Sequence, residues 1–223
     1  MQTASTYSRN TAISTHPFNY GKSGPSLGAA SQRAFAKGTE VFGEGNPSTF
    51  FYKVVSGTVR TVKLLSDGRR QIDAFHVPGD WFGLENGQNH RVTAEAVDQV
   101  LVIPYRRGDL GSLLKTDPAL IEALMASTLV NLDRAHEHMV LLGRKTALER
   151  MASFMLELAA RMDVSDRLRL PMQRSDIADH LGLTIETVSR TVMQMVRADL
   201  IKLDDGGRTI VLANRKGLEL LGA

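Results

Sequence analysis

The segment from residue 174 to residue 198 constrains the fold of this chain more than any other. Apolar residues recur at helical spacing on both sides of Gly182, which predicts two short helices around a tight turn. Gly182 can adopt the left-handed backbone conformation that ends a helix sharply. Thr184 is then a suitable N-cap, because its hydroxyl can accept from the free amides of the next turn. The segment therefore predicts a helix-turn-helix.

The second helix of this pair has an apolar back and a polar front. Its apolar residues are Val188, Val192, Met195 and Val196. Glu186, Ser189 and Arg190 share the opposite face, because residues three and four apart are neighbours on a helix. A helix that is seated by its apolar back can present such a face to the major groove of DNA.

The residue types on this face suit DNA bases. An arginine can donate two hydrogen bonds to guanine, and a glutamate can accept one from the cytosine amino group. We therefore predict base contacts by Glu186, Ser189 and Arg190, with Ile185 against a thymine methyl group at the groove entrance. Glu186 and Arg190 can also brace each other as an ion pair; the alternative interpretation is a solvated surface pair. Phosphate contacts, which fix position without reading sequence, are predicted for Arg174, Ser175, Thr184, Thr187 and Thr191.

Length and composition fit a soluble protein with one large or two modest domains. The chain has 223 residues, of which 43% are hydrophobic and 23% charged, and a net charge of only +3. DNA binding must then come from the placement of charge rather than from its total. The absence of cysteine excludes disulfides, cysteine-ligated zinc and a cysteine-ligated iron–sulfur cluster. With no membrane-length apolar run and no secretory signal, we expect a cytoplasmic protein without a membrane partner.

The N-terminal half predicts a tail followed by a β-domain. Residues 1–30 are rich in Ser, Thr, Gly and Asn without periodicity, which predicts a flexible N-terminal tail. Residues 31–117 predict a compact β-roll, because short apolar runs alternate with Gly, Asp and Pro turns. Asp67-Gly68 is the strongest hairpin signal among these turns. A short helix and turn are expected over residues 106–117.

A long helix is predicted from Pro118, since proline is tolerated in the first helical turn. Small or apolar side chains in alternating steps of four and three form a coiled-coil seam along it. The seam consists of Ile121, Met125, Thr128, Leu132, Ala135, Met139 and Leu142. Leu120, Leu124 and Leu129 lie to one side and are expected to pack on the roll. One helix cannot bury both stripes against its own domain, so residues 118–143 are predicted to form a homodimer interface; the alternative is an ordinary core helix.

The C-terminal part, residues 144–223, predicts a winged helix. Helical periodicity runs from Gly143 to Met162, and the helix-turn-helix follows it. Two short apolar runs around the Asp204–Gly207 turn predict a β-hairpin. The predicted fold class is therefore α+β, with an N-terminal double-stranded β-roll, a long dimerisation helix and a C-terminal winged helix-turn-helix.

This order of elements resembles the CRP/FNR superfamily of bacterial transcription regulators over roughly residues 33–220. The residues that carry the resemblance are Lys37-Gly38, Gly43-Glu44-Gly45-Asn46, Ser56-Gly57-Thr58-Val59, Asp67-Gly68-Arg69, Pro78-Gly79-Asp80-Trp81-Phe82-Gly83 and the run from Asp176 to Arg190. That run is most similar to the FixK branch, which implies control of low-oxygen respiration and nitrogen metabolism. The resemblance also implies RNA polymerase as a partner. It assigns Glu186, Ser189 and Arg190 to a TTGAT-type half-site.

The resemblance implies a cyclic-nucleotide-binding-like roll, but the residues argue against that ligand. In such receptors a Gly-Glu pair holds the ribose, and an arginine followed by Ser or Thr holds the phosphate. Here Glu85 is displaced by one position, and neither His90 nor Arg91 belongs to an Arg-Ser or Arg-Thr pair. We expect Arg91 to be a surface charge and the roll to bind neither cyclic nucleotide nor cofactor. The alternative is a CRP-type regulator with an unidentified small-molecule effector in the roll.

Two other classes of site are weighed and set aside. His76 or His90 could ligate haem in principle, but a lone histidine is more often a surface or core residue. A cupin-type enzyme would need His76, Glu85 and His90 to converge on a metal, and their spacing is unfamiliar for that. We therefore expect no enzyme, no catalytic residue and no metal site. The sequence predicts a homodimeric transcription activator that binds an inverted TTGAT-like repeat.

Overall fold

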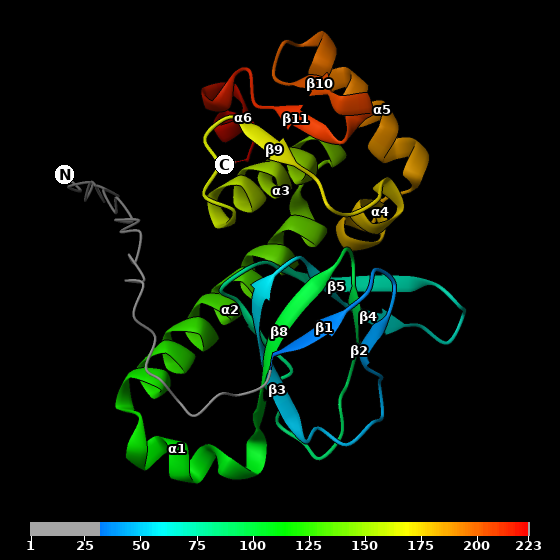
Figure 1. Cartoon of the computed structure of the whole chain (residues 1–223). Coiled ribbons are helices and arrows are strands. Elements are labelled where there is room, and N and C mark those ends of the chain that lie inside the picture. The colour runs from blue at the N-terminus through cyan, green and yellow to red at the C-terminus, as the bar shows by residue number, and fades with distance from the viewer. Residues whose placement is uncertain (1–31, 223) are drawn as a thin grey trace, which may run out of the picture.

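The computed structural model of the protein describes residues 32–222 (Figure 1). The flexible tail expected over residues 1–30 lies outside the described residues. The described chain forms a β-roll, a long helix that runs along the roll, and a winged-helix domain beyond it. The predicted fold class is confirmed.

Two four-stranded antiparallel sheets make the roll. The first sheet has the order β1 (Arg33–Phe35), β8 (Val100–Arg106), β3 (Phe50–Ser56), β6 (Trp81–Phe82). The second has the order β2 (Glu40–Phe42), β7 (Thr93–Ala96), β4 (Val59–Leu64), β5 (Arg70–His76). Apolar residues of both sheets share one core that includes Phe42, Tyr52, Val59, Phe82 and Val102. The β3–β4 turn requires Gly57, because its φ is +78° and a Cβ there would lie 2.3 Å from the Gln99 carbonyl oxygen.

The helices that follow the roll begin with a short turn. They are a 3₁₀ turn (Arg107–Asp109), α1 (Leu110–Thr116) and α2 (Pro118–Arg144). The Asp117 carboxylate caps α2 by accepting from the Leu120 amide at 3.0 Å. Leu120 and Leu124 are buried against Phe51 of the roll, as expected. Leu129 was expected there too, but it is 59% exposed because it lies beyond the part of α2 that contacts the roll core.

The chain breaks between α2 and α3 (Ala147–Arg161), where the sequence predicted one continuous helix. The cause is a capping box at Thr146. Its side chain accepts from the Glu149 amide, and the Glu149 carboxylate accepts from the Thr146 amide at 2.7 Å. These two bonds satisfy amides that a continuous helix would have used, so a new helix starts in a new direction.

The winged-helix domain packs four helices, α3 and three that follow it, against a small sheet. Its elements are β9 (Arg167–Arg169), α4 (Arg174–Leu181), α5 (Ile185–Arg197), β10 (Lys202–Asp204), a 3₁₀ turn (Asp205–Gly207), β11 (Thr209–Val211) and α6 (Arg215–Gly222). The sheet order is β10-β11-β9. The predicted hairpin is β10 and β11; strand β9 was not predicted. Asn214 caps α6 by accepting from the Gly217 amide at 2.9 Å.

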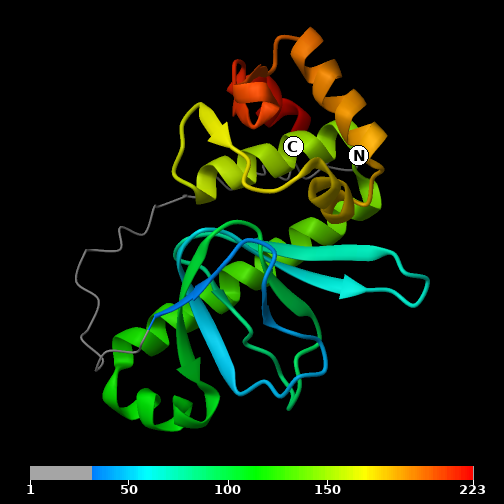
Figure 2. The same cartoon turned by 45° about the vertical axis from the view of Figure 1, so that its right-hand side comes forward.

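The roll contacts the winged-helix domain through α4, and also through α3, whose Arg161 pairs with Asp80 of the roll. Both views place α4 against the roll beside β5, with α5 on the outer side of the domain (Figures 1 and 2). None of the helices in residues 32–222 is both long and apolar enough to span a membrane.

Candidate DNA-binding surface

The turn between α4 and α5 has the predicted geometry. Gly182 ends α4 in the left-handed conformation, with φ +62° and ψ +41°. The Thr184 hydroxyl accepts from the Thr187 amide at 3.1 Å and caps α5. These local interactions end α4 and start α5 within a three-residue turn.

The apolar face of α5 packs into the core of the domain, as predicted. Val188, Val192 and Met195 are buried in the core that α3 and α4 complete. On the opposite face Glu186 and Arg190 are exposed, Ser189 is half-buried and Ile185 is 48% exposed. The structure therefore brings the four predicted base-contact residues together on one outward face.

Arg174 joins the start of α4 to this face. Its Nη1 donates to the Ser189 hydroxyl oxygen at 3.2 Å. A Cβ on Gly207, in the turn between β10 and β11, would lie 3.4 Å from the other terminal nitrogen of Arg174. The recognition face and the wing are therefore adjacent, with the Arg174 guanidinium between them.

Glu186 is prepared to accept hydrogen bonds. Its own backbone N–H and the Thr184 hydroxyl donate to the carboxylate, and Arg190 lies nearby, so the pKa of Glu186 is below its usual range. In the described part of the chain, however, no direct ion pair joins Glu186 to Arg190. The ion-pair brace that their spacing suggested is therefore not formed.

The predicted phosphate contacts differ in how accessible they are. Arg174 and Thr184 are exposed, and Ser175 and Thr187 are half-buried. Thr191 is only 5% exposed and faces the domain core with its neighbour Val192. A hydroxyl in that position cannot reach a phosphate unless the helix moves.

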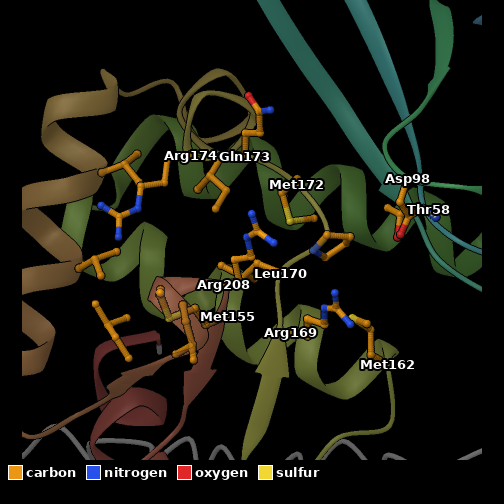
Figure 3. A pocket seen from close by; sticks show the side chains of 18 of the residues that line it. Thr58, Asp98, Met155, Met162, Arg169, Leu170, Met172, Gln173, Arg174 and Arg208 are labelled. Carbon is orange, nitrogen blue, oxygen red and sulfur yellow. Dashed lines mark hydrogen bonds between the residues drawn. The ribbon is translucent and has the colours of Figure 1, made fainter. Parts of the chain in front are cut away.

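Two further arginines, Arg169 and Arg208, line the same cleft as Arg174 and were not singled out from the sequence. This cleft, of about 910 Å³, lies between the winged helix and the roll, and Figure 3 shows side chains that line it. Arg174 lies at one end of this cleft, Arg208 and Arg169 lie further along it, and Asp98 of the roll lies at the other end. Arg169 and Arg208 are exposed and form no ion pair within residues 32–222. Their place beside the wing is the signal that could have identified them.

The predicted seam of α2 is largely uncovered in the single chain. Met125 is 61%, Leu132 51% and Met139 64% exposed. Thr128 and Ala135 are exposed as well, whereas Ile121 and Leu142 are half-buried. A helix face this apolar is unusual on a monomeric surface.

The residues weighed as ligand groups in the roll serve the roll itself. Glu85 accepts from the Arg91 amide and lies 3.1 Å from Nδ1 of His90. The His90 ring is buried and stacks on Phe42 at 3.6 Å between centroids. Arg91 is exposed, as expected.

His76 lies apart from that pair. Its ring stacks on Phe82 and has a neighbour in the Thr61 hydroxyl, and burial lowers the pKa of His76 to about 4. Within residues 32–222 no three His, Asp or Glu side chains are gathered in a way that could hold a metal ion.

Comparison with known proteins agrees with this geometry. Residues 32–117 match the cyclic nucleotide-binding domain family, and residues 149–221 match the Crp-like helix-turn-helix domain family. The nitrogen fixation regulation protein FixK of Azorhizobium caulinodans is 45% identical over 192 residues, which are 84% of this chain and 77% of that protein. This chain belongs to the CRP/FNR family, in its FixK-like branch. FixK of Rhizobium meliloti is 40% identical over 199 residues, or 89% of each protein.

A solved structure extends the agreement to three dimensions. FixK2 from Bradyrhizobium japonicum matches with a TM-score of 0.81 and 47% identity, covering 87% of this chain and 98% of that one. Membership of this family makes the FixK-like chain a transcription regulator and not an enzyme.

Proposed function

We propose that this FixK-like regulator binds an inverted TTGAT-like repeat as a homodimer, with the outer face of α5 in the major groove. The observation that carries the proposal is the sorting of side chains on α5. Its apolar back is buried, and Ile185, Glu186, Ser189 and Arg190 share the exposed front. Such a helix can enter the groove without loss of its own packing.

Each residue of this front has a matching base edge. The Arg190 guanidinium is free of ion pairs within the described residues and can donate twice to guanine. The ionised Glu186 can accept from the cytosine amino group of the same or a neighbouring pair. Ser189 is oriented by Arg174, and Ile185 offers an apolar surface to a thymine methyl group.

The surrounding polar groups would hold the phosphates. Thr184 and Thr187 lie at the N-terminus of α5, where backbone amides also favour negative charge, and Arg174 and Ser175 begin α4. Thr191 is left out of this set because it is buried. Arg174 supplies the charge of the set.

A second copy of the chain would cover the α2 seam. Pairing along a two-fold axis buries Met125, Leu132 and Met139 against the same residues of the partner. The same axis then presents two α5 helices to successive turns of one duplex face, which explains the inverted repeat.

We further propose an activator that contacts RNA polymerase and needs neither cyclic nucleotide nor an iron–sulfur cluster. The chain has no cysteine to supply thiolates. Glu85 is already engaged by His90 and the Arg91 amide, so the carboxylate is not free for a ribose.

One observation favours the second candidate, an effector-responsive regulator. A cavity of about 720 Å³ lies between the roll and α2, with Thr61, Glu85, Thr128, Arg134 and His138 among its lining residues. A small molecule bound there would contact both the sensor domain and the seam helix.

A salt-controlled gel shift tests the main proposal. The purified protein without added ligand is titrated onto an inverted TTGAT repeat and onto the same duplex with both half-sites scrambled. We expect clear preference for the repeat, and the same preference when cyclic AMP is added. If the protein prefers the inverted repeat only after a small-molecule extract of cells is added, the second candidate is favoured. Equal binding to both duplexes under all conditions would contradict both.

A further inference from the structure

Two arginines of the roll form ion pairs with α4, the first helix of the helix-turn-helix. Arg60 on β4 donates from Nη1 to Oδ1 of Asp176 at 2.8 Å. Arg70 on β5 donates from Nη2 to the same oxygen at 2.9 Å, and to Oδ2 of Asp179 at 2.7 Å. Both acids lie on α4, so these ion pairs join the two domains rather than neighbours in the sequence.

The centre of this group is buried and electrically matched. The Asp176 side chain is 4% exposed, and its other oxygen accepts from the Gln173 amide at 3.2 Å. On the roll side, Nη2 of Arg60 also pairs with Oε2 of Glu95 at 2.7 Å. A buried ion pair of this kind adds little net stability, but it strongly penalises arrangements that leave one charge unpaired.

The other end of α4 is held by uncharged contacts. His180 Nδ1 lies 3.1 Å from the Ile72 carbonyl oxygen of β5, and burial lowers the pKa of His180 to about 3, so the ring is neutral. His138 of α2 donates to the His180 carbonyl oxygen at 2.9 Å. A helix with contacts at only one end can rotate about that end, whereas α4 has contacts with the rest of the chain at both ends.

The orientation of α4 is passed on to α5. Only three residues, Gly182 to Thr184, separate the two helices, and both ends of that turn are capped. Helix α5 lies on the side of the winged-helix domain away from the roll (Figures 1 and 2), and Ile185, Glu186 and Arg190 are exposed on it. The direction of α5 relative to α2 therefore depends on how α4 sits on β5.

We infer that Arg60 and Arg70 are positioning residues for DNA binding: they fix the direction of α5 relative to the α2 seam and so set the half-site spacing that the dimer accepts. The inference rests on the proposed function. It assigns no base or phosphate contact to either arginine.

The chain offers a matched pair of variants for the test. Arg70→Gln removes the interdomain charge. Arg69→Gln changes the neighbouring residue, whose side chain is 78% exposed and, within residues 32–222, pairs only with Asp67 of the same turn. Arg70→Lys keeps the charge without the forked geometry. Because the chain has no cysteine, Asn86→Cys on the roll and Lys216→Cys on α6 provide two unique, exposed sites for spin labels.

The first measurement is the label-to-label distance distribution without DNA, in labelled protein diluted with excess unlabelled protein. We expect a narrow distribution for the parent and Arg69→Gln, a broader one for Arg70→Gln, and partial recovery in Arg70→Lys. An Arg70→Gln distribution identical to the parent would overturn the inference. Should Arg70→Gln fail to fold, Asp179→Asn replaces it, because this side chain is 29% exposed and its loss leaves Asp176 paired. An unchanged distribution in that variant would overturn the inference equally.

The second measurement is the preference among inverted repeats whose spacer is changed by one or two base pairs. Arg70→Gln should lose about three- to tenfold of the parent's preference for its best spacing, while its preference for intact over scrambled half-sites is kept. Retained spacing preference would contradict the inference. A parent protein that prefers no inverted repeat would instead contradict the proposed function, and the label distances distinguish the two failures.

Discussion

At the scale of single residues, the α5 face is organised before DNA arrives. Glu186 is ionised by hydrogen bonds from its own turn, and Ser189 is oriented by Arg174. Groups that are already placed lose less conformational entropy on binding, which favours affinity. Arg190 is the exception, because its guanidinium makes no direct hydrogen bond or ion pair within residues 32–222, although Glu186 lies nearby. Its removal should therefore affect DNA binding and leave the fold intact.

We predict that Arg190→Ala costs about 1–3 kcal/mol of binding free energy at the inverted repeat and relaxes the choice of base at the guanine. Binding to scrambled DNA should change much less, since a base contact carries specificity. Quantitative gel shifts at fixed salt measure both values. Arg197→Ala is the matched control, because Arg197 is exposed in the last turn of the same helix. Equal losses on both duplexes would show that Arg190 contacts only phosphate.

At the scale of elements, α2 serves two surfaces. Leu120 and Leu124 bury one side of its first half against the roll, while Met125, Leu132 and Met139 remain open on another side. The helix is long enough, at 27 residues, to form several turns of a seam. Leu141 near the end of α2 is buried within the chain itself, but Met125, Leu132 and Met139 gain apolar burial only if a second chain covers them.

Met139→Asp should therefore weaken the dimer. Each of two copies would lose about 1.5–3 kcal/mol of apolar burial, so the dissociation constant should rise roughly a hundredfold or more. Sedimentation across a concentration series measures this change. Val130→Asp makes the same chemical change at a position that is 45% exposed and outside the seam, and it should leave the dimer intact. A dimer that survives Met139→Asp but not Val130→Asp would place the interface elsewhere on α2.

Elements with strong periodicity could be predicted from the sequence, and the structure shows why others could not. Helices α2, α4 and α5 could be predicted, because their apolar residues recur at helical spacing and because capping residues such as Gly182 mark their ends. Strand β9 has three residues with only Leu168 buried, too short for any alternation to show. Thr191 was placed on the wrong side of α5, because a polar side chain next to the apolar face gives no periodic signal.

Contacts between distant elements were beyond sequence reasoning. Arg60 and Arg70 meet Asp176 across more than a hundred residues, and nothing in the local sequence of either segment indicates its partner. The engagement of Glu85 by His90 is local in the sequence, but it was not predicted either, because it depends on how one loop of the roll folds back. The exposed face of α5 that carries the proposed base contacts was predictable because it lies within one helix. Its orientation was not predictable, because it depends on a second domain.

At the scale of the whole molecule, Asp80 joins three parts of the structure. It lies in the roll just before β6, and its carboxylate pairs with Arg134 of α2 at 3.2 Å and with Arg161 of α3 at 2.7 Å. Burial alone would raise the pKa of Asp80, but the Arg161 guanidinium and the Val77 amide outweigh it and lower the pKa. The ionised carboxylate thus connects the roll, the seam helix and the winged-helix domain at one point.

Asp80→Asn should uncouple these parts. It leaves the Arg161 side chain, which is 13% exposed, without its main counter-charge, and this should cost about 3 kcal/mol of unfolding free energy at neutral pH. Because folding lowers the pKa of Asp80, its contribution is full above the unfolded pKa and is lost as pH falls through the lower folded pKa. The difference between parent and variant should therefore be large at pH 7 and shrink in acid. Calorimetry across pH measures it, and Asp73→Asn on exposed β5 surface should change little. A constant difference from pH 7 down to strong acid would mean that Asp80 stabilises the fold through packing rather than through its charge.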